Sequence, residues 1–254
     1  LNDRTFRAMI DRRKFLRLSA ITSAAALAGR SFAAKRLPFA PTGTTGSPIV
    51  VSTWDFGKQA NAAAWEFLGK GGSSLDAVEA GARVPEADPT NQSVGLGGRP
   101  DRDGHVTLDA CIMDARGRCG SVAALENIVH AVSVARMVME RTPHVMLAGE
   151  GALQFALENG FKKENLLTEQ SRKEWEEWLK TAKYQPVKNI ENALPGGAPN
   201  HDTIGILALD AAGDLGGACT TSGMAYKLRG RVGDSPIIGA GLFVDNEVGG
   251  ATST

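Results

Sequence analysis

The sequence lacks a charge surplus, a dense set of cysteines and a long apolar run. Its 254 residues carry 28 Lys and Arg against 28 Asp and Glu, without the basic excess that coating nucleic acid requires. Three cysteines in a chain of this length exclude a small disulfide-stapled scaffold. The apolar stretch near the start, residues 18–29, is about half as long as a membrane-spanning helix. The composition indicates a globular protein with a sizeable core and no nucleic-acid partner.

The motifs that hold common cofactors are also missing. The four histidines, His105, His130, His144 and His201, include no pair four residues apart and have no cysteine at ligand spacing. Gly95-Leu96-Gly97-Gly98 has neither the spacing of a dinucleotide fingerprint nor the Gly-Lys-Ser/Thr of a phosphate loop. No Gly-x-Ser-x-Gly elbow occurs. We therefore expect no metal and no cofactor.

The first 33 residues have the features of an export signal. Arg12-Arg13-Lys14-Phe15-Leu16 precedes the Ala-rich run 18–29, and Ser31-Phe32-Ala33 supplies small residues at the positions that a signal peptidase reads. This segment resembles a bacterial twin-arginine signal, which implies a periplasmic protein, no membrane contact after export and a mature chain from about Ala34. The alternative is an ordinary basic amphipathic N-terminus.

Hydrophobic periodicity predicts helices between pairs of strands. Two hairpins have the same plan: an apolar strand, an Asp, a short Gly-containing turn and a strand of small residues. The first covers Val106 to Ala124 and the second Thr203 to Thr221, and helical spacing recurs at 57–68, 74–81, 133–141, 148–158 and 168–180. Helices alternating with hairpins predict a layered α/β domain.

The three cysteines cannot all pair with one another. Cys111 and Cys119 flank the turn of the first hairpin and could form a disulfide across it, which would leave Cys219 as a thiol.

One junction has an unusual composition. An irregular segment rich in Pro, Gly and Asn, residues 184–200, ends at His201-Asp202, and Thr203 at once opens an apolar strand. Cleavage of the Asp202–Thr203 bond would give Thr203 a free α-amino group, a general base with a pKa of roughly 7.7–8.0 beside its own hydroxyl. The cut could be self-made, by attack of the Thr203 hydroxyl on the Asp202 carbonyl. On composition alone, Thr203 could equally be an ordinary β-branched strand residue.

Three motifs favour the first interpretation: His201-Asp202-Thr203-Ile204-Gly205, Thr220-Thr221-Ser222-Gly223 and the segment Gly230 to Gly241, which contains Arg231-Val232-Gly233-Asp234-Ser235. Together they resemble the glycosylasparaginase (aspartylglucosaminidase) family of N-terminal-nucleophile hydrolases. The similarity extends from Ile49 to Thr254.

The resemblance implies a fold and a reaction. The fold would be an αββα four-layer sandwich whose precursor splits into residues 34–202 and a second subunit that starts at Thr203. The reaction would be hydrolysis of the amide that joins N-acetylglucosamine to asparagine, a small-molecule substrate, with Thr203 as nucleophile and its own amine as base. The family also suggests a homodimer of cleaved protomers.

The resemblance assigns further site residues. Arg231 would bind the substrate's α-carboxylate and Asp234 its α-ammonium, with Gly233 between them and Trp54 lining the pocket. A surface salt bridge is the alternative for Arg231 and Asp234, and a core position is the alternative for Trp54.

Two further threonines complete the implied catalytic set. Thr221 would lie beside the nucleophile, and Thr254 would donate its hydroxyl to the oxyanion hole.

Two features depart from the family pattern. Residues 193–200 resemble an insertion just before the scissile pair, which could slow processing. The chain begins with Leu and stops at Thr254, whereas the family continues with a glycine whose N–H completes the oxyanion hole. We therefore expect a C-terminally truncated precursor, whose activity is in doubt because one lost oxyanion donor costs on the order of 10²–10³ in rate.

Two alternative functions stay open. Isoaspartyl peptidases with asparaginase activity share the threonine and the Arg/Asp clamp but typically have Gly before the threonine, so Asp202 and Trp54 favour glycosylasparaginase. A truncated chain could instead be an inactive domain that binds amino acids through Arg231 and Asp234.

Overall fold

A computed structural model describes residues 47–182 and 203–254. All of them belong to one compact unit, Gly43–Thr254. The expected signal segment, the insertion-like residues 193–200 and Asp202 lie outside the described residues.

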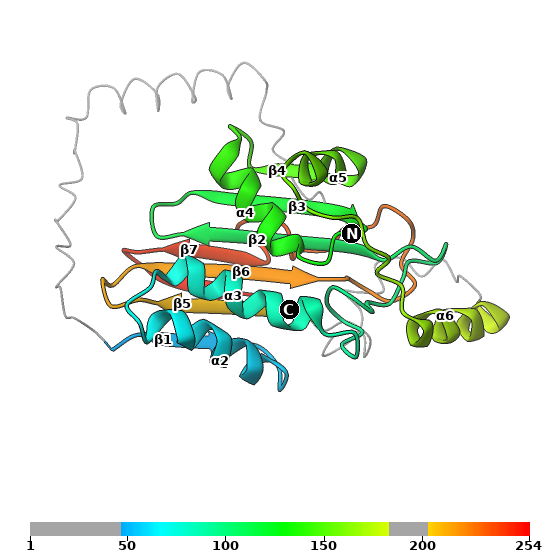
Figure 1. Cartoon of the computed structure of the whole chain (residues 1–254), viewed down its shortest axis with the longest axis horizontal. Helices are drawn as coiled ribbons and strands as arrows, with labels where there is room; N and C mark the ends of the chain where they lie inside the picture. Colours follow the sequence, from blue (N-terminus) through cyan, green and yellow to red (C-terminus); the bar gives the residue numbers. More distant parts are fainter. Residues whose placement is uncertain (1–46, 183–202) are drawn as a thin grey trace, which may run out of the picture. The chain divides into compact units, whose positions relative to one another are not determined.

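A six-stranded sheet forms the centre of this unit (Figure 1). Its strand order is β1-β5-β6-β2-β3-β4, and every neighbouring pair is antiparallel except β3 with β4. The strands are β1 (Ile49–Ser52), β2 (Thr107–Asp114), β3 (Cys119–Glu126), β4 (Met146–Ala148), β5 (Ile204–Leu209) and β6 (Leu215–Thr221). Strands β7 (Leu242–Asp245) and β8 (Gly249–Thr252) make a separate antiparallel pair.

Both predicted hairpins are confirmed, and their turns share one mechanism. In the β2–β3 turn, Asp114 Oδ1 accepts hydrogen bonds from the backbone N–H groups of Arg116 and Arg118. In the β5–β6 turn, Asp210 Oδ1 does the same for Ala212 and Asp214. A glycine with positive φ lies in each turn, at 117 and 213, so the Asp and Gly positions that identified the hairpins also build them.

The helices also lie where the periodicity predicts them. They are α2 (Gly57–Leu68), α3 (Ser74–Ala87), α4 (Ala131–Arg141), α5 (Gly149–Glu158) and α6 (Glu169–Thr181). Ser73 caps α3, because its hydroxyl accepts the Asp76 N–H at 3.1 Å. No helix in residues 47–182 or 203–254 has the length and apolarity to cross a membrane.

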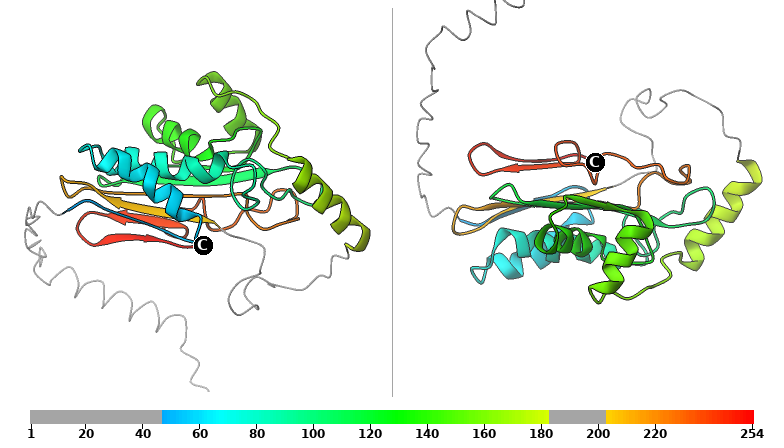
Figure 2. Two further views of the ribbon diagram at one scale, coloured as in Figure 1. Left: turned by 60° about the horizontal axis from the view of Figure 1, so that its bottom comes forward. Right: turned by 90° about the horizontal axis from the view of Figure 1, so that it is seen from above.

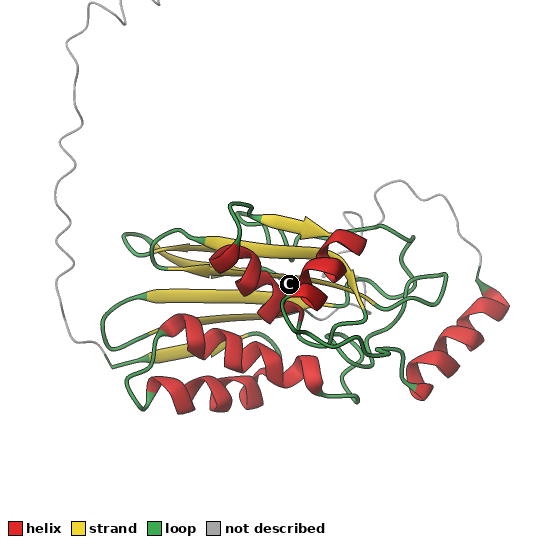
Figure 3. Cartoon of the chain, turned by 45° about the horizontal axis from the view of Figure 1, so that its top comes forward, coloured by secondary structure: helices red, strands yellow, loops and turns green. Residues whose placement is uncertain are grey.

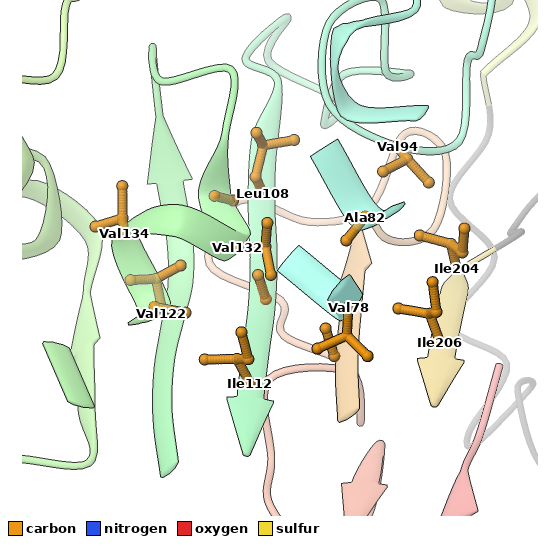
Figure 4. Packing of buried hydrophobic residues seen from close by; sticks show 14 of the residues in the cluster. Val78, Ala82, Val94, Leu108, Ile112, Val122, Val132, Val134, Ile204 and Ile206 are labelled. Carbon is orange, nitrogen blue, oxygen red and sulfur yellow. The ribbon is translucent and has the colours of Figure 1, made fainter. Parts of the chain in front are cut away.

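The elements stack as three layers. Figure 3 shows helices, in red, lying over one face of the yellow strands. The β7–β8 pair lies against the opposite face of the large sheet (right-hand view of Figure 2). Between helices and sheet lies the main core, in which Val78 and Ala82 of α3 face Ile204 and Ile206 of β5 (Figure 4). The observed fold is therefore mixed α/β, as predicted, and its described layers are helix, sheet and sheet.

Glycines let the two sheets approach closely. A Cβ placed on Gly205 of β5 would lie 2.3 Å from the Thr252 Oγ1 of β8, and one on Gly217 of β6 would lie 2.6 Å from the Leu242 Cδ1 of β7. Neither glycine has the positive φ that only glycine readily adopts. Glycine is therefore required at both positions because the neighbouring strand leaves no space for a side chain.

We expect Gly205→Ala to destabilise the protein, because the new methyl group must push β8 away from β5. Overpacking of this kind costs about 1–3 kcal/mol, and each kcal/mol lowers the Tm of a domain this size by roughly 2–4 °C. Gly151→Ala in α5 is the matched control, because nothing lies within 4 Å of its added methyl group. Thermal unfolding followed by circular dichroism measures both, and equal Tm values for the two variants would contradict the packing argument.

Cys111 and Cys119, whose pairing the sequence left open, do not form a disulfide, since all three cysteines are free thiols. The hairpin register places Ser121 opposite Cys111, and Cys119 opposite Met113. The two cysteines are therefore diagonal neighbours, with Cα atoms about 7–8 Å apart, beyond the reach of a disulfide.

Candidate active site

A cavity of about 530 Å³ opens where β2 and β5 begin and β6 ends, on the face of the sheet that carries β7 and β8. Six of the residues that the sequence assigned to the site line it: Thr203, Thr221, Arg231, Gly233, Asp234 and Thr254. They come from two strand ends, one loop and the segment after β8, so the fold brings together residues up to 51 positions apart.

Thr203 is held firmly at the start of β5. It is only 5% exposed, and its Oγ1 lies 3.3 Å from the Ser235 Oγ. The Thr53 hydroxyl donates to the Thr203 carbonyl at 3.0 Å and accepts the Gly205 N–H at 3.1 Å. The hydroxyl of Thr203 therefore faces the cavity from a backbone that a second threonine fixes.

Thr221 lies beside Thr203 on the neighbouring strand. The register pairs Ile204 with Thr220, so its next step brings Thr203 opposite Thr221. The Thr221 Oγ1 accepts the Gly223 N–H at 2.9 Å, and its hydroxyl faces the Ser93 carbonyl oxygen at 3.4 Å. These contacts orient the Thr221 hydroxyl at the cavity wall.

The loop after β6 contributes charges of both signs. Arg231 folds over Gly233, where an added Cβ would lie 3.1 Å from the Arg231 Nη1. Asp234 accepts a hydrogen bond from the Ser253 hydroxyl at its Oδ2, 3.0 Å away. A guanidinium and a carboxylate that line one cavity can bind the carboxylate and the ammonium of a free amino-acid end.

Trp54 does not line this cavity. Its side chain is 51% exposed and its backbone has a φ of +63°, an uncommon conformation for a bulky residue. Its neighbour Thr53 makes the contacts to β5 instead. Thr254, two residues after the end of β8, does line the cavity.

Sequence reasoning missed three residues of the site: Thr53, Ser235 and Asp109. Ser235 stands directly after Asp234 in the motif, so its proximity could have been suspected. Asp109 also lines the cavity, and a carboxylate among the apolar residues in the interior of a strand is a signal that was available. Thr53 carries no such signal, because its contacts depend on how β1 pairs with β5.

Comparisons with known proteins agree with the motifs. A family model described as asparaginase matches residues 44–254. An N(4)-(β-N-acetylglucosaminyl)-L-asparaginase from Elizabethkingia miricola is 62% identical over 244 residues, which are 96% of this chain and 69% of that protein. Proteins of the same description from Mus musculus and Rattus norvegicus are 39% and 38% identical, each over 84% of this chain and 68% of their own length.

Proposed function

The chain belongs to the asparaginase family, and on that basis we propose that it hydrolyses the amide bond between N-acetylglucosamine and the side chain of asparagine. The observation that carries the proposal is the single cavity that contains Thr203, Thr221, Arg231 and Asp234. It offers a hydroxyl nucleophile beside a pair of charges that suits the amino-acid end of glycosylasparagine.

The reaction would proceed in two steps. Arg231 and Asp234 hold the α-carboxylate and α-ammonium, which directs the side-chain amide toward Thr203. The Thr203 Oγ attacks the amide carbon while its free α-amine takes the hydroxyl proton and passes it to the departing glycosylamine. Water then hydrolyses the resulting ester, releases aspartate and restores the hydroxyl.

Three neighbouring groups would support these steps. The Ser235 hydroxyl is placed to orient the Thr203 Oγ. Thr221 lies opposite Thr203 across the strand pair, and Thr254 lines the same cavity, where its hydroxyl would donate to the oxyanion.

The α-amine requires a cut before Thr203, which we propose the chain makes itself. The Thr203 Oγ would attack the Asp202 carbonyl carbon, and the C–N bond would break as the acyl group moves from nitrogen to oxygen, which frees the Thr203 amine. Water would then hydrolyse the ester to the Asp202 α-carboxylate and the Thr203 hydroxyl. The contact of Thr53 with the Thr203 carbonyl supports the idea, because it fixes the residue that must attack. The products would be residues 34–202 and the subunit that starts at Thr203.

Three further features belong to the proposal. The fold would be the αββα four-layer sandwich, in which a second helical layer covers the β7–β8 side. The mature protein would act in the periplasm after twin-arginine export, and its cleaved protomers would form a homodimer. Cell fractionation and light scattering test the last two points.

Intact mass spectrometry before and after extended incubation tests self-cleavage. Two fragments with the boundary Asp202/Thr203 support it, and a single uncut mass contradicts it. Parallel assays with glycosylasparagine, a β-aspartyl peptide and L-asparagine identify the preferred substrate. Preference for the β-aspartyl peptide would indicate an isoaspartyl peptidase, and calorimetric heat with aspartate without turnover would indicate a binding domain.

Ser235→Ala should lower kcat more than it raises KM, because Ser235 contacts the nucleophile. A neutral hydrogen bond contributes about 0.5–1.5 kcal/mol, which predicts a fall of roughly 2- to 12-fold in kcat. Ser253→Ala is the matched comparison, since its hydroxyl contacts Asp234 and its loss should raise KM instead. Steady-state kinetics on glycosylasparagine measure both, and identical kinetic changes in the two variants would contradict these roles.

A further inference from the structure

A buried carboxylate that the mechanism does not use lies at the cavity wall. Asp109, in the middle of the sheet, is 1% exposed and is the β2 partner of Thr221. Opposite Asp109 the β2–β3 register shifts, because β3 has one residue more than β2 between the pairs Leu108–Leu125 and Ala110–Val122. The Ala124 N–H donates to Asp109 Oδ1 at 2.8 Å, from a backbone with a φ of +50°. Asp109 faces the cavity by the ordinary alternation of β2, on the same side of the sheet as Cys111 and Met113.

A buried lysine lies behind this carboxylate. Lys227 is 1% exposed, and its Nζ donates to the Ser222 carbonyl at 2.9 Å. Its Nζ is 4.0 Å from Asp109 Oδ2, a distance that is too long for a hydrogen bond but still within the range of an ion pair. In the part of the chain that the structure describes, Asp109 Oδ2 has no hydrogen-bond partner. Because an isolated buried charge is very costly, each of these groups requires the other.

Arg231 is the third charge of this group. Burial raises the pKa of Asp109, while the positive charges of Lys227 and Arg231 lower it. Burial and the charge of Arg231 lower the pKa of Lys227, and Asp109 opposes them. Cys219 of β6 also feels the charge of Asp109. Asp109 is thus an anion that lines the cavity together with Arg231 and lies 4.0 Å from the buried Lys227.

We propose that Asp109 is a positioning residue whose negative charge acts on the Arg231 guanidinium in the cavity that both line, and that Lys227 neutralises Asp109 so that the site still attracts an anion. The proposal rests on the proposed function, because it concerns recognition of the α-carboxylate. Without Lys227, an uncompensated carboxylate would repel that group of the substrate. Without Asp109, the Arg231 guanidinium would lose the influence of an anion that lines the same cavity.

This charge arrangement predicts a specific pattern of KM values. Asp109→Asn should raise KM for glycosylasparagine about 10-fold, with kcat within about 3-fold of the wild type. Lys227→Met should raise KM about 100-fold at pH 8, because Asp109 becomes an unpaired anion. The double variant should have the KM of Asp109→Asn alone, since the repelling charge is gone.

The pH dependence has a definite sign. Loss of Lys227 removes a charge that lowers the pKa of Asp109, so this pKa rises in Lys227→Met. As the pH falls through that raised pKa, Asp109 becomes neutral and KM should fall toward the value of Asp109→Asn. Asp114→Asn, at the other end of β2 and outside the cavity, is the control for loss of a buried carboxylate and should change Tm but not KM.

A second measurement does not depend on turnover. Carbon-13 NMR of aspartate-labelled protein follows the titration of the Asp109 carboxyl, which should move to higher pH in Lys227→Met and in Arg231→Gln but not in Arg229→Gln. If Lys227→Met does not fold, the shift in Arg231→Gln and the KM of the double variant decide the matter. An unchanged Asp109 titration, or a double variant whose KM is the product of the single effects, would overturn the inference. A coupled titration in a wild-type chain that turns over no glycosylasparagine would contradict the proposed function alone.

Discussion

Replacement of Thr203 by alanine will abolish both self-cleavage and hydrolysis. The variant lacks the Thr203 hydroxyl, which lines the cavity, contacts the Ser235 hydroxyl and belongs to the same residue as the proposed α-amine. Removal of a nucleophile typically lowers kcat by about 10⁴-fold or more, so we expect the kcat of Thr203→Ala to be below about 1/10⁴ of the wild-type value. Intact mass spectrometry should show one uncut chain.

Thr203→Ser is the control, because it keeps the hydroxyl and removes only the methyl group. It should still cleave and turn over, at a lower rate, while Thr203→Ala does neither. Two fragments from Thr203→Ala would locate the cut elsewhere and contradict the assignment of the nucleophile.

Substitution of Arg231 should produce the second largest loss of activity. A planar guanidinium can bind a carboxylate with two parallel hydrogen bonds, whereas lysine supplies the charge without that geometry. We expect kcat/KM to fall about 10²-fold in Arg231→Lys and about 10³-fold in Arg231→Gln, mainly through KM. Steady-state kinetics on glycosylasparagine give both values.

Arg229→Gln is the matched control from the same loop. Arg229 pairs with Glu126 and Asp101 and does not line the cavity, so its loss should leave KM unchanged. A substrate analogue without the α-carboxylate should be hydrolysed with the same kcat/KM by the wild type and by Arg231→Gln. If Arg231→Gln lowers kcat/KM for the analogue as much as it does for the full substrate, Arg231 acts through something other than carboxylate binding.

Local signals predicted most of the secondary structure. The two hairpins depend on an Asp that binds its own turn and on a Gly with positive φ, and both residues can be read from the sequence. The helices follow from apolar spacing and from caps such as Ser73. The motif residues of the site came together because they lie at strand ends and in one loop.

Features that depend on tertiary register could not be predicted. Whether Cys111 and Cys119 pair depends on the hairpin register, which offsets the two cysteines by two residues and keeps their thiols apart. The role of Thr53 depends on the pairing of β1 with β5, which are about 150 residues apart in the sequence. The Asp109–Lys227 pair depends on how β2 meets the loop after β6, and this contact between distant parts of the chain has no pattern in the sequence.

The glycine contact between the sheets has a geometric consequence. Gly205 lies two residues after Thr203, and its partner Thr252 lies two residues before Thr254. Thr203 and Thr254 therefore each lie two residues from a close contact between the bare backbone of β5 and one side chain of β8. This contact limits how far apart the two strands lie, whatever the length of the connection that precedes Thr203. We therefore expect a change in the length of that connection, or its cleavage, to leave the separation of Thr203 and Thr254 unchanged.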